Sequence, residues 1–289
     1  MEGHEPVRRN RLSAPLGTHN AVLSARARAH FVKDFPGPLS IKSVVEGRVS
    51  WKSGGRELVV DRDSFLVLNQ GEPYSMEFES RTPVATLCIF FQNGFLESIS
   101  ASAAGQSIEP AAAPAPFLGR MHPRDDRILP RMKAIAATGE YDKLWLDGQY
   151  LELAHDLLLL HSDFVRRVNL MPARRAATRE ELFHRVCRGQ EMLHADPTID
   201  WGLSEIAREA CLSPFHFHRA FSRAFGKTPH QYRNDLRLAR ARRLLEGTDM
   251  TVTEICGAVG FESAPSFSAL YRQSFGMPPT TARKLSNSR

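Results

Sequence analysis

Two short stretches near the end of this 289-residue chain carry side chains suited to contacting nucleic acid. In the first, residues at helical spacing combine an aromatic ring with hydrogen-bond donors: Phe215, His218, Arg219, Ser222 and Arg223. Such donors can reach guanine and phosphate oxygens, and an aromatic ring can meet a thymine methyl group. The second stretch offers shorter side chains and one arginine: Ser268, Ala269, Arg272 and Gln273. We therefore expect both faces to contact DNA and the first to carry most of the base discrimination.

The elements that position these faces form a repeat with an offset of 50 residues. Phe217, Phe221, Phe225, Gly226 and Pro229 recur as Phe267, Tyr271, Phe275, Gly276 and Pro279. Each copy reads as a helix that stops at glycine, with proline soon after. A shorter helix precedes each one. The Thr251/Glu254 capping box marks the start of the second shorter helix, and Ser213 caps the longer helix of the first copy. The pattern predicts two helix-turn-helix units, at about 203–225 and 251–275, joined by a helix.

The charge distribution supports a polyanion-binding role for this part of the chain. The net charge is +6, and residues 174–289 account for all of it with 18 Lys+Arg and 12 Asp+Glu. Residues 1–173 are neutral overall. A neutral half joined to a basic half is typical of a sensor or assembly domain attached to a nucleic-acid-binding domain.

The neutral half contains a β-rich segment from about Ile41 to Phe91. Short runs of branched and aromatic residues alternate there with turn residues, at roughly ten-residue spacing, which favours an antiparallel sandwich or small barrel. The predicted strands are 41–45, 48–52, 57–60, 64–69, 75–79 and 84–91. Residues 1–30 are basic and poor in aromatics, so they are predicted to form a flexible arm.

Two helices are predicted between Arg124 and Val168, and the second has a narrow apolar seam. Its main members are Leu146, Tyr150, Leu153 and Leu157. The seam can pack on its own barrel or pair with a second subunit, and the sequence leaves both open. Residues 174–180, with Arg174 and Arg175, are predicted to link the two halves.

No catalytic, metal or cofactor site is predicted. No histidine occurs between His30 and His122, and no zinc-type cysteine pair, Ser-His-Asp pattern or phosphate-binding loop is present. The four isolated cysteines suggest reduced thiols and a cytoplasmic location. The longest apolar run, Val84–Phe91, is too short to span a membrane, and no secretory signal is expected.

From about His184 to Lys284 the chain resembles the AraC/XylS family of transcription regulators. The resemblance is carried by seven runs: Ile206–Phe221, Gly226–Pro229, Leu236–Leu245, Val252–Cys256, Gly260–Ser263, Phe267 and Phe275–Pro279. It implies that Phe215, His218 and Arg219 touch bases and that Arg272 touches the DNA backbone. The chain departs from the family at Ala269, where longer polar readers are common, and at Cys211, where glycine is frequent.

The runs Gly47–Trp51, Gly55–Val60 and Ser64–Asn69 are similar to the cupin-like sensor barrel of the same family. The resemblance implies an α+β chain with a barrel and helices at 31–173 and an all-α DNA-binding domain at 181–289. We expect a non-enzymatic transcription regulator. The resemblance implies an activator, because activation is more usual in the family than repression. Its expected partners are operator DNA, RNA polymerase, a small-molecule effector and a second copy of the chain. The alternatives are a ligand-independent regulator whose barrel only assembles, or a cupin-type enzyme with an incidental helical tail.

Overall fold

The computed structural model describes residues 15–103, 120–123, 126–138 and 142–286. Contacts divide the chain into two compact units, Met1–Val165 and Arg166–Arg289. The predicted class is confirmed: an antiparallel β barrel followed by helices in the first unit, and a helical second unit with two helix-turn-helix motifs.

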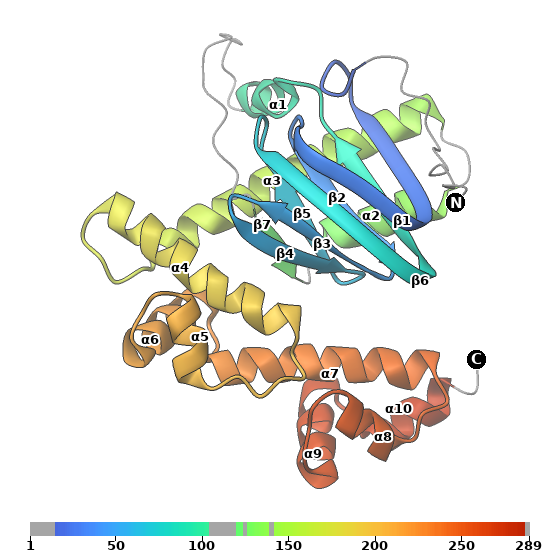
Figure 1. The fold of residues 1–289 in the computed structure, drawn as a ribbon, viewed down its shortest axis with the longest axis vertical. Coiled ribbons are helices and arrows are strands. Elements are labelled where there is room, and N and C mark those ends of the chain that lie inside the picture. The colour runs from blue at the N-terminus through green and yellow to red at the C-terminus, as the bar shows by residue number, and fades with distance from the viewer. Residues whose placement is uncertain (1–14, 104–119, 124–125, 139–141, 287–289) are drawn as a thin grey trace. The chain divides into compact units, whose positions relative to one another are not determined.

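Within the described residues, seven antiparallel strands of the first unit form one curved sheet that nearly closes into a barrel (Figure 1). The strand order is β4-β3-β6-β2-β5-β7, and β1 pairs with β6. The strands are β1 (Ala21–Pro36), β2 (Ser40–Glu46), β3 (Arg48–Ser53), β4 (Arg56–Asp61), β5 (Ser64–Leu68), β6 (Pro73–Phe90) and β7 (Arg120–Pro123).

Strand β6 is a long strand that pairs with three other strands of the barrel. The predicted strands at 75–79 and 84–91 are one continuous element, which pairs with β1 along one edge and with β3 and then β2 along the other. Strand β1 corrects the prediction of a flexible arm over residues 1–30, because residues 21–30 lie in the sheet and 1–14 lie outside the described residues. Backbone pairing places β1, while its charged side chains such as Arg26 stay exposed, so its composition resembled that of an arm.

Alternate residues of the sheet supply two separate cores, as the two-residue period of a strand requires. In β2, Ile41 belongs to the core that packs under the helices, and Val44 belongs to the core inside the barrel. The barrel interior also contains Trp51, Tyr74 and Met76. The helices of this unit are α1 (Phe95–Ala103), α2 (Ile128–Ala137) and α3 (Lys143–Asn169).

The apolar seam of α3 packs within its own subunit. Leu146, Tyr150, Leu153 and Leu157 all lie in the core under the sheet, and none is more than 8% exposed. These four side chains were candidates for pairing with a second subunit, and their burial makes them unavailable for it. Seven-residue periodicity alone did not distinguish a sheet from a helix as the partner.

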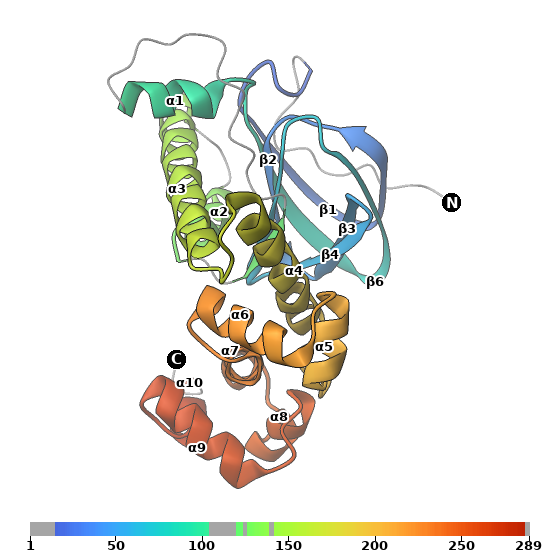
Figure 2. The same cartoon turned by 90° about the vertical axis from the view of Figure 1, so that its left-hand side faces the viewer.

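The second unit consists of α4 (Ala176–Ala195), α5 (Leu203–Glu209), α6 (Pro214–Phe225), α7 (Pro229–Gly247), α8 (Val252–Ala258), α9 (Ala264–Phe275) and α10 (Pro279–Ser286). Figure 2 looks almost along α7, which joins the α5–α6 motif to the α8–α9 motif. The linker predicted at 174–180 is corrected: its last five residues form the first turns of α4, and the non-helical stretch covers 170–175.

Candidate nucleic-acid interface and barrel pocket

Helix α6 is held in place by signals at both ends. The Ser213 hydroxyl accepts a hydrogen bond from the backbone N–H of His216, and Pro214 occupies the first turn. Gly226 ends the helix in the left-handed conformation with φ of 68°, which glycine adopts without the steric cost of a Cβ. Phe217 and Phe221 are fully buried beneath the helix. The opposite face is therefore presented rigidly to solvent.

The exposed face of α6 brings together most of the predicted DNA-contacting residues. Phe215 is 70% exposed, and His218, Arg219 and Arg223 are also exposed. Among the described residues, neither Arg219 nor Arg223 forms an ion pair, so both guanidinium groups can bind phosphate or base edges. Ser222 does not share this face: it is half-buried, and its hydroxyl oxygen is covered by the protein.

Helix α9 begins and ends with the same kinds of residue as α6, but its exposed face carries fewer side chains that can contact DNA. Ser263 caps it by accepting from the backbone N–H of Ser266, and Gly276 ends it with φ of 75°. Ala269, Arg272 and Gln273 are exposed, and Ser268 is half-buried. This face holds one cation, Arg272, and presents only a methyl group at position 269, in agreement with the sequence.

The loop before α5 contacts both α7 and the turn after α8. Arg237 of α7 donates to the backbone carbonyls of Pro197 at 2.6 Å and Thr198 at 3.0 Å, and its guanidinium lies 5.7 Å from the ring of Phe261. At Gly260, in the turn after α8, a Cβ would lie 2.5 Å from the carbonyl oxygen of Thr198. The spacing of α6 and α9 is thus maintained by this loop in addition to α7.

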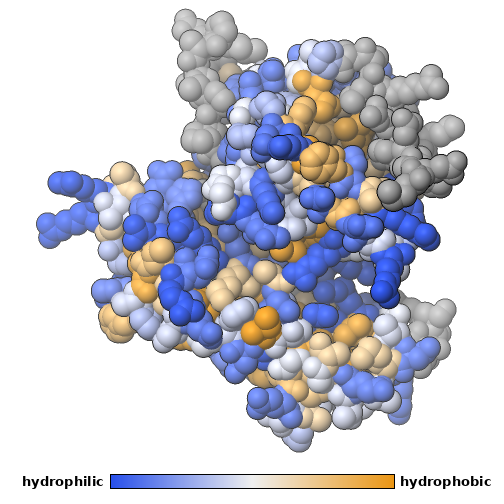
Figure 3. All heavy atoms as spheres, in the orientation of Figure 1, coloured by the Kyte–Doolittle hydropathy of each residue, from blue (hydrophilic) through white to orange (hydrophobic). Residues whose placement is uncertain are grey.

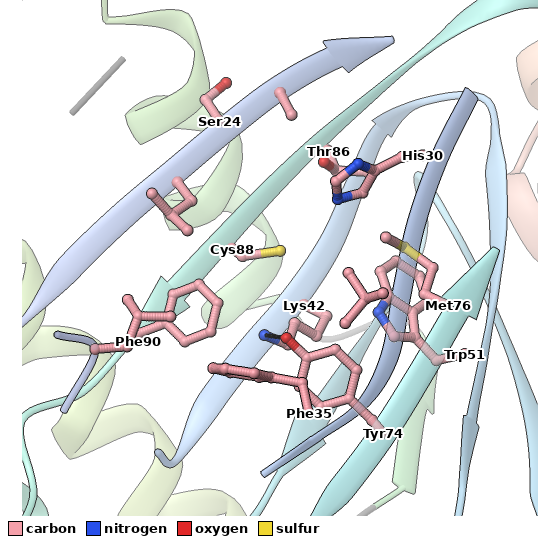
Figure 4. Close-up of a pocket in the computed structure, with 14 residues that line it drawn as sticks. Ser24, His30, Phe35, Lys42, Trp51, Tyr74, Met76, Thr86, Cys88 and Phe90 are labelled. Carbon is pink, nitrogen blue, oxygen red and sulfur yellow. Dashed lines mark hydrogen bonds between the residues drawn. The ribbon is translucent and has the colours of Figure 1, made fainter. Parts of the chain in front are cut away.

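The barrel encloses a cavity of about 240 Å³ between β1, β2, β3 and β6. Its walls are largely apolar, with Phe35, Trp51, Met76 and Phe90 among the lining side chains. Figure 4 shows the amine of Lys42 and the hydroxyl of Tyr74 meeting in this pocket, where Lys42 Nζ donates to Tyr74 Oη at 3.1 Å.

Burial sets the ionisation of the polar groups in the pocket. It lowers the pKa of Lys42 to about 8, while the neighbouring Cys88 acts in the opposite direction. Burial also raises the pKa values of the Tyr74 hydroxyl and the Cys88 thiol, so both groups stay neutral at physiological pH. At pH 7 Lys42 is therefore mainly charged, whereas Tyr74 and Cys88 beside it are neutral.

Comparison with known proteins relates both units to one family. The AraC-like ligand binding domain matches residues 23–145, and a helix-turn-helix domain matches residues 206–285. The thermoregulatory protein LcrF of Yersinia pestis is 25% identical over 244 residues, covering 83% of this chain and 87% of LcrF. The chain belongs to the AraC family. It is a DNA-binding transcription regulator with an N-terminal ligand-binding domain.

Other relatives match about a third of this AraC-family chain. The transcriptional activator RhaS of Escherichia fergusonii is 37% identical over 91 residues, covering 32% of each chain. A solved AraC-type regulator from Chromobacterium violaceum is 30% identical and covers 36% of this chain and 93% of its own, with a TM-score of 0.34.

Two arginines that bind backbone carbonyls within the DNA-binding unit, the buried Arg233 and the half-buried Arg283, were not apparent from the sequence. Arg233 pairs with Asp200 at 2.6 Å and donates to the carbonyl of Trp201. Its counterpart at the 50-residue offset, Arg283, donates to the carbonyls of Leu245, Thr248 and Met250 in the second copy. The same offset that revealed the glycines would have revealed these arginines.

The pocket lysine was also missed, although Lys42 lies inside a predicted strand, between Ile41 and Ser43. In the described part of the chain, no three His, Cys, Asp or Glu side chains are grouped closely enough to hold a metal ion. None of the described helices combines the length and apolar character needed to cross a membrane.

Proposed function

We propose that this AraC-family regulator activates transcription as a cytoplasmic homodimer that binds operator DNA, contacts RNA polymerase and responds to a small molecule held in its barrel. Activation is supported by relatives such as RhaS, whose name describes an activator. The cytoplasm follows from the need to reach DNA. Sensing is supported by the cavity, because a barrel that only assembled subunits would need no partly polar pocket at its centre.

Base discrimination is assigned mainly to α6. The observation that carries this assignment is Arg219: its exposed guanidinium, without an ion pair in the described structure, projects from a helix capped at both ends. Phe215 and His218 lie beside it as further base contacts. Arg272 of α9 is assigned to the DNA backbone, and Ala269 offers a methyl group for contact with thymine.

Operator selection from random DNA, followed by binding to single-base variants, tests this assignment. Arg219→Ala is expected to lose about 1–3 kcal/mol of discrimination at one or two base pairs. Arg272→Ala is expected to weaken binding to every sequence alike and to reduce the salt slope by about 1. Arg185→Ala is the control, because Arg185 already pairs with Glu181 at 2.8 Å on α4. An unchanged base preference in Arg219→Ala, with a changed one in Ala269→Gly, would show that α9 reads the sequence.

The homodimer is assigned to the outward face of α3, opposite the buried seam. Leu144, Leu151 and Val165 are exposed, the first two at 80% and 51%, and they fall on a seven-residue interval whose remaining member, Leu158, is half-buried against the core. That interval suits the pairing of two helices, and a second copy presents the same stripe. The double variant Leu144→Glu/Leu151→Glu is expected to sediment as a monomer. Leu285→Glu, at an exposed leucine of α10, is the control, and a double variant that stays dimeric would refute the assignment.

A further inference from the structure

The barrel pocket contains a positive charge that the protein itself compensates only in part. Lys42 is 1% exposed and lies directly opposite Cys88 in the pairing of β2 with β6. Its ammonium is 3.7 Å from the ring centroid of Phe90 and 4.5 Å from that of Tyr74. Aromatic faces attract cations, but they replace only a fraction of the hydration that an ammonium loses on burial.

Among the described residues that line the pocket there is no Asp or Glu, so none of them supplies a carboxylate to pair with Lys42. The ammonium is therefore suited to bind an anionic ligand. Lysine has three donor hydrogens, and the recorded hydrogen bond to Tyr74 uses one of them. Because Tyr74 Oη accepts that bond, its own hydrogen can be donated to a ligand. The two groups together present donors to one anionic end.

The remaining lining determines the body of the ligand. Phe35 and Met76 line the cavity near the Lys42–Tyr74 pair (Figure 4). Leu23 and Val32 also belong to its lining. Figure 3 shows that hydrophobic residues also reach the surface of this unit, among hydrophilic ones. A volume of about 240 Å³ lies below the usual range of ligand pockets, which favours a small molecule.

We infer that the barrel binds a small monocarboxylic acid with an apolar body, with the carboxylate on Lys42 Nζ and Tyr74 Oη and the body among the aromatic side chains. This inference rests on the proposed sensing function and specifies its effector class. Binding depends on the charged form of Lys42, so affinity falls as pH rises through about 8. Cys88 and Tyr74 face the same space but have raised pKa values, and His30 is the other titratable group in the lining.

Calorimetric titration of the full chain at pH 7 tests the inference with hexanoate and benzoate against hexanamide and benzamide. Each acid is expected to bind about tenfold or more tightly than its amide, since a hydrogen bond to a charged group contributes that much. The ratio of hexanoate to benzoate affinity tells whether the body is aliphatic or aromatic. Equal binding of acids and amides, or no binding of either acid, overturns the inference.

Variants locate the site. Lys42→Met keeps the length and apolar character of the side chain and is expected to lose about tenfold or more in acid affinity without weakening amide binding. Tyr74→Phe removes only the hydroxyl and is expected to give a smaller loss for the acids alone. Lys52→Met, at an exposed lysine of β3, should bind as the wild type does. Unchanged acid binding in folded Lys42→Met or Tyr74→Phe contradicts the placement.

Operator binding and a promoter reporter separate this inference from the proposed function. An acid that binds through Lys42 and changes operator affinity or transcription supports both. An acid that binds through Lys42 without changing either supports the site and refutes sensing. Operator binding that stays intact while no acid binds refutes the ligand class and leaves DNA recognition in place.

Discussion

Replacing Gly189 by alanine should loosen the packing between α4 and α6. A Cβ at this position would lie 2.5 Å and 2.6 Å from two ring carbons of Phe217 and 2.9 Å from Cγ2 of Ile206. Carbon atoms normally rest about 3.5–4.0 Å apart, so the fully buried Phe217 ring would have to move by about 1 Å. Glycine here is therefore required by the close approach of α6 to α4.

The magnitude follows from two opposing effects. Overpacking a close-packed core costs about 1–3 kcal/mol. Alanine in place of glycine gains up to about 1 kcal/mol in a helix. Gly257→Ala in α8 is the matched control, because a Cβ there meets nothing within 4 Å. The helix gain is common to both variants, so their stabilities should differ by roughly the overpacking cost, about 1–3 kcal/mol.

Hydrogen exchange of the full chain, followed by mass spectrometry, measures this difference for peptides of α4 and α6, with β6 as the internal reference. Gly189→Ala should speed exchange in α4 and α6 and weaken operator binding, and Gly257→Ala should not. Shortening the obstructing ring by Phe217→Leu should cost less in the Gly189→Ala background than alone. Equal protection in the two glycine variants, or strictly additive effects in the double variant, would refute the packing argument.

Three further outcomes are expected. Cys211 has φ of 52°, so Cys211→Gly should stabilise the second unit by about 1 kcal/mol in thermal unfolding, while Cys211→Ala keeps the strain and should not. Because burial lowers the pKa of Lys42 from 10.5 to about 8, the unfolded chain binds more protons between those values and stability rises with pH there. Lys42→Met should lack that rise. At pH 7 the variant should be more stable than the wild type by about 3 kcal/mol at most, and urea unfolding should show a smaller difference at pH 10. Arg237→Met should weaken binding to a complete operator more than to the half contacted by α6, in fluorescence titrations, because the loop contact between the two motifs is lost; equal losses on both would contradict that coupling.

Local rules made the DNA-binding unit readable from the sequence. Ser213, the Thr251/Glu254 box and the glycines at 226 and 276 act within one helical turn, and each was confirmed where the sequence placed it. The exposed position of Arg219 also followed from helical periodicity alone. The 50-residue repeat strengthened these local signals by presenting them twice.

Other features depend on chain segments that are distant in sequence. Strand β1 forms because its backbone pairs with that of β6, and the hydrophobic pattern of β1 does not predict that pairing. The apolar seam of α3 faces inward because the sheet packs against it. Helical periodicity does not indicate whether a sheet or another helix is the packing partner.

The pocket shows the same distinction most clearly. Strand alternation predicts that Lys42 points to one face of β2, but only closure of the barrel makes that face an interior. The curved sheet brings Tyr74 and Phe90 from β6 to the lysine amine and removes water from it, which lowers its pKa. The sequence by itself determined the helices that present the DNA-contacting side chains, whereas the tertiary structure decided that a lysine of an ordinary strand became a buried charge in a cavity.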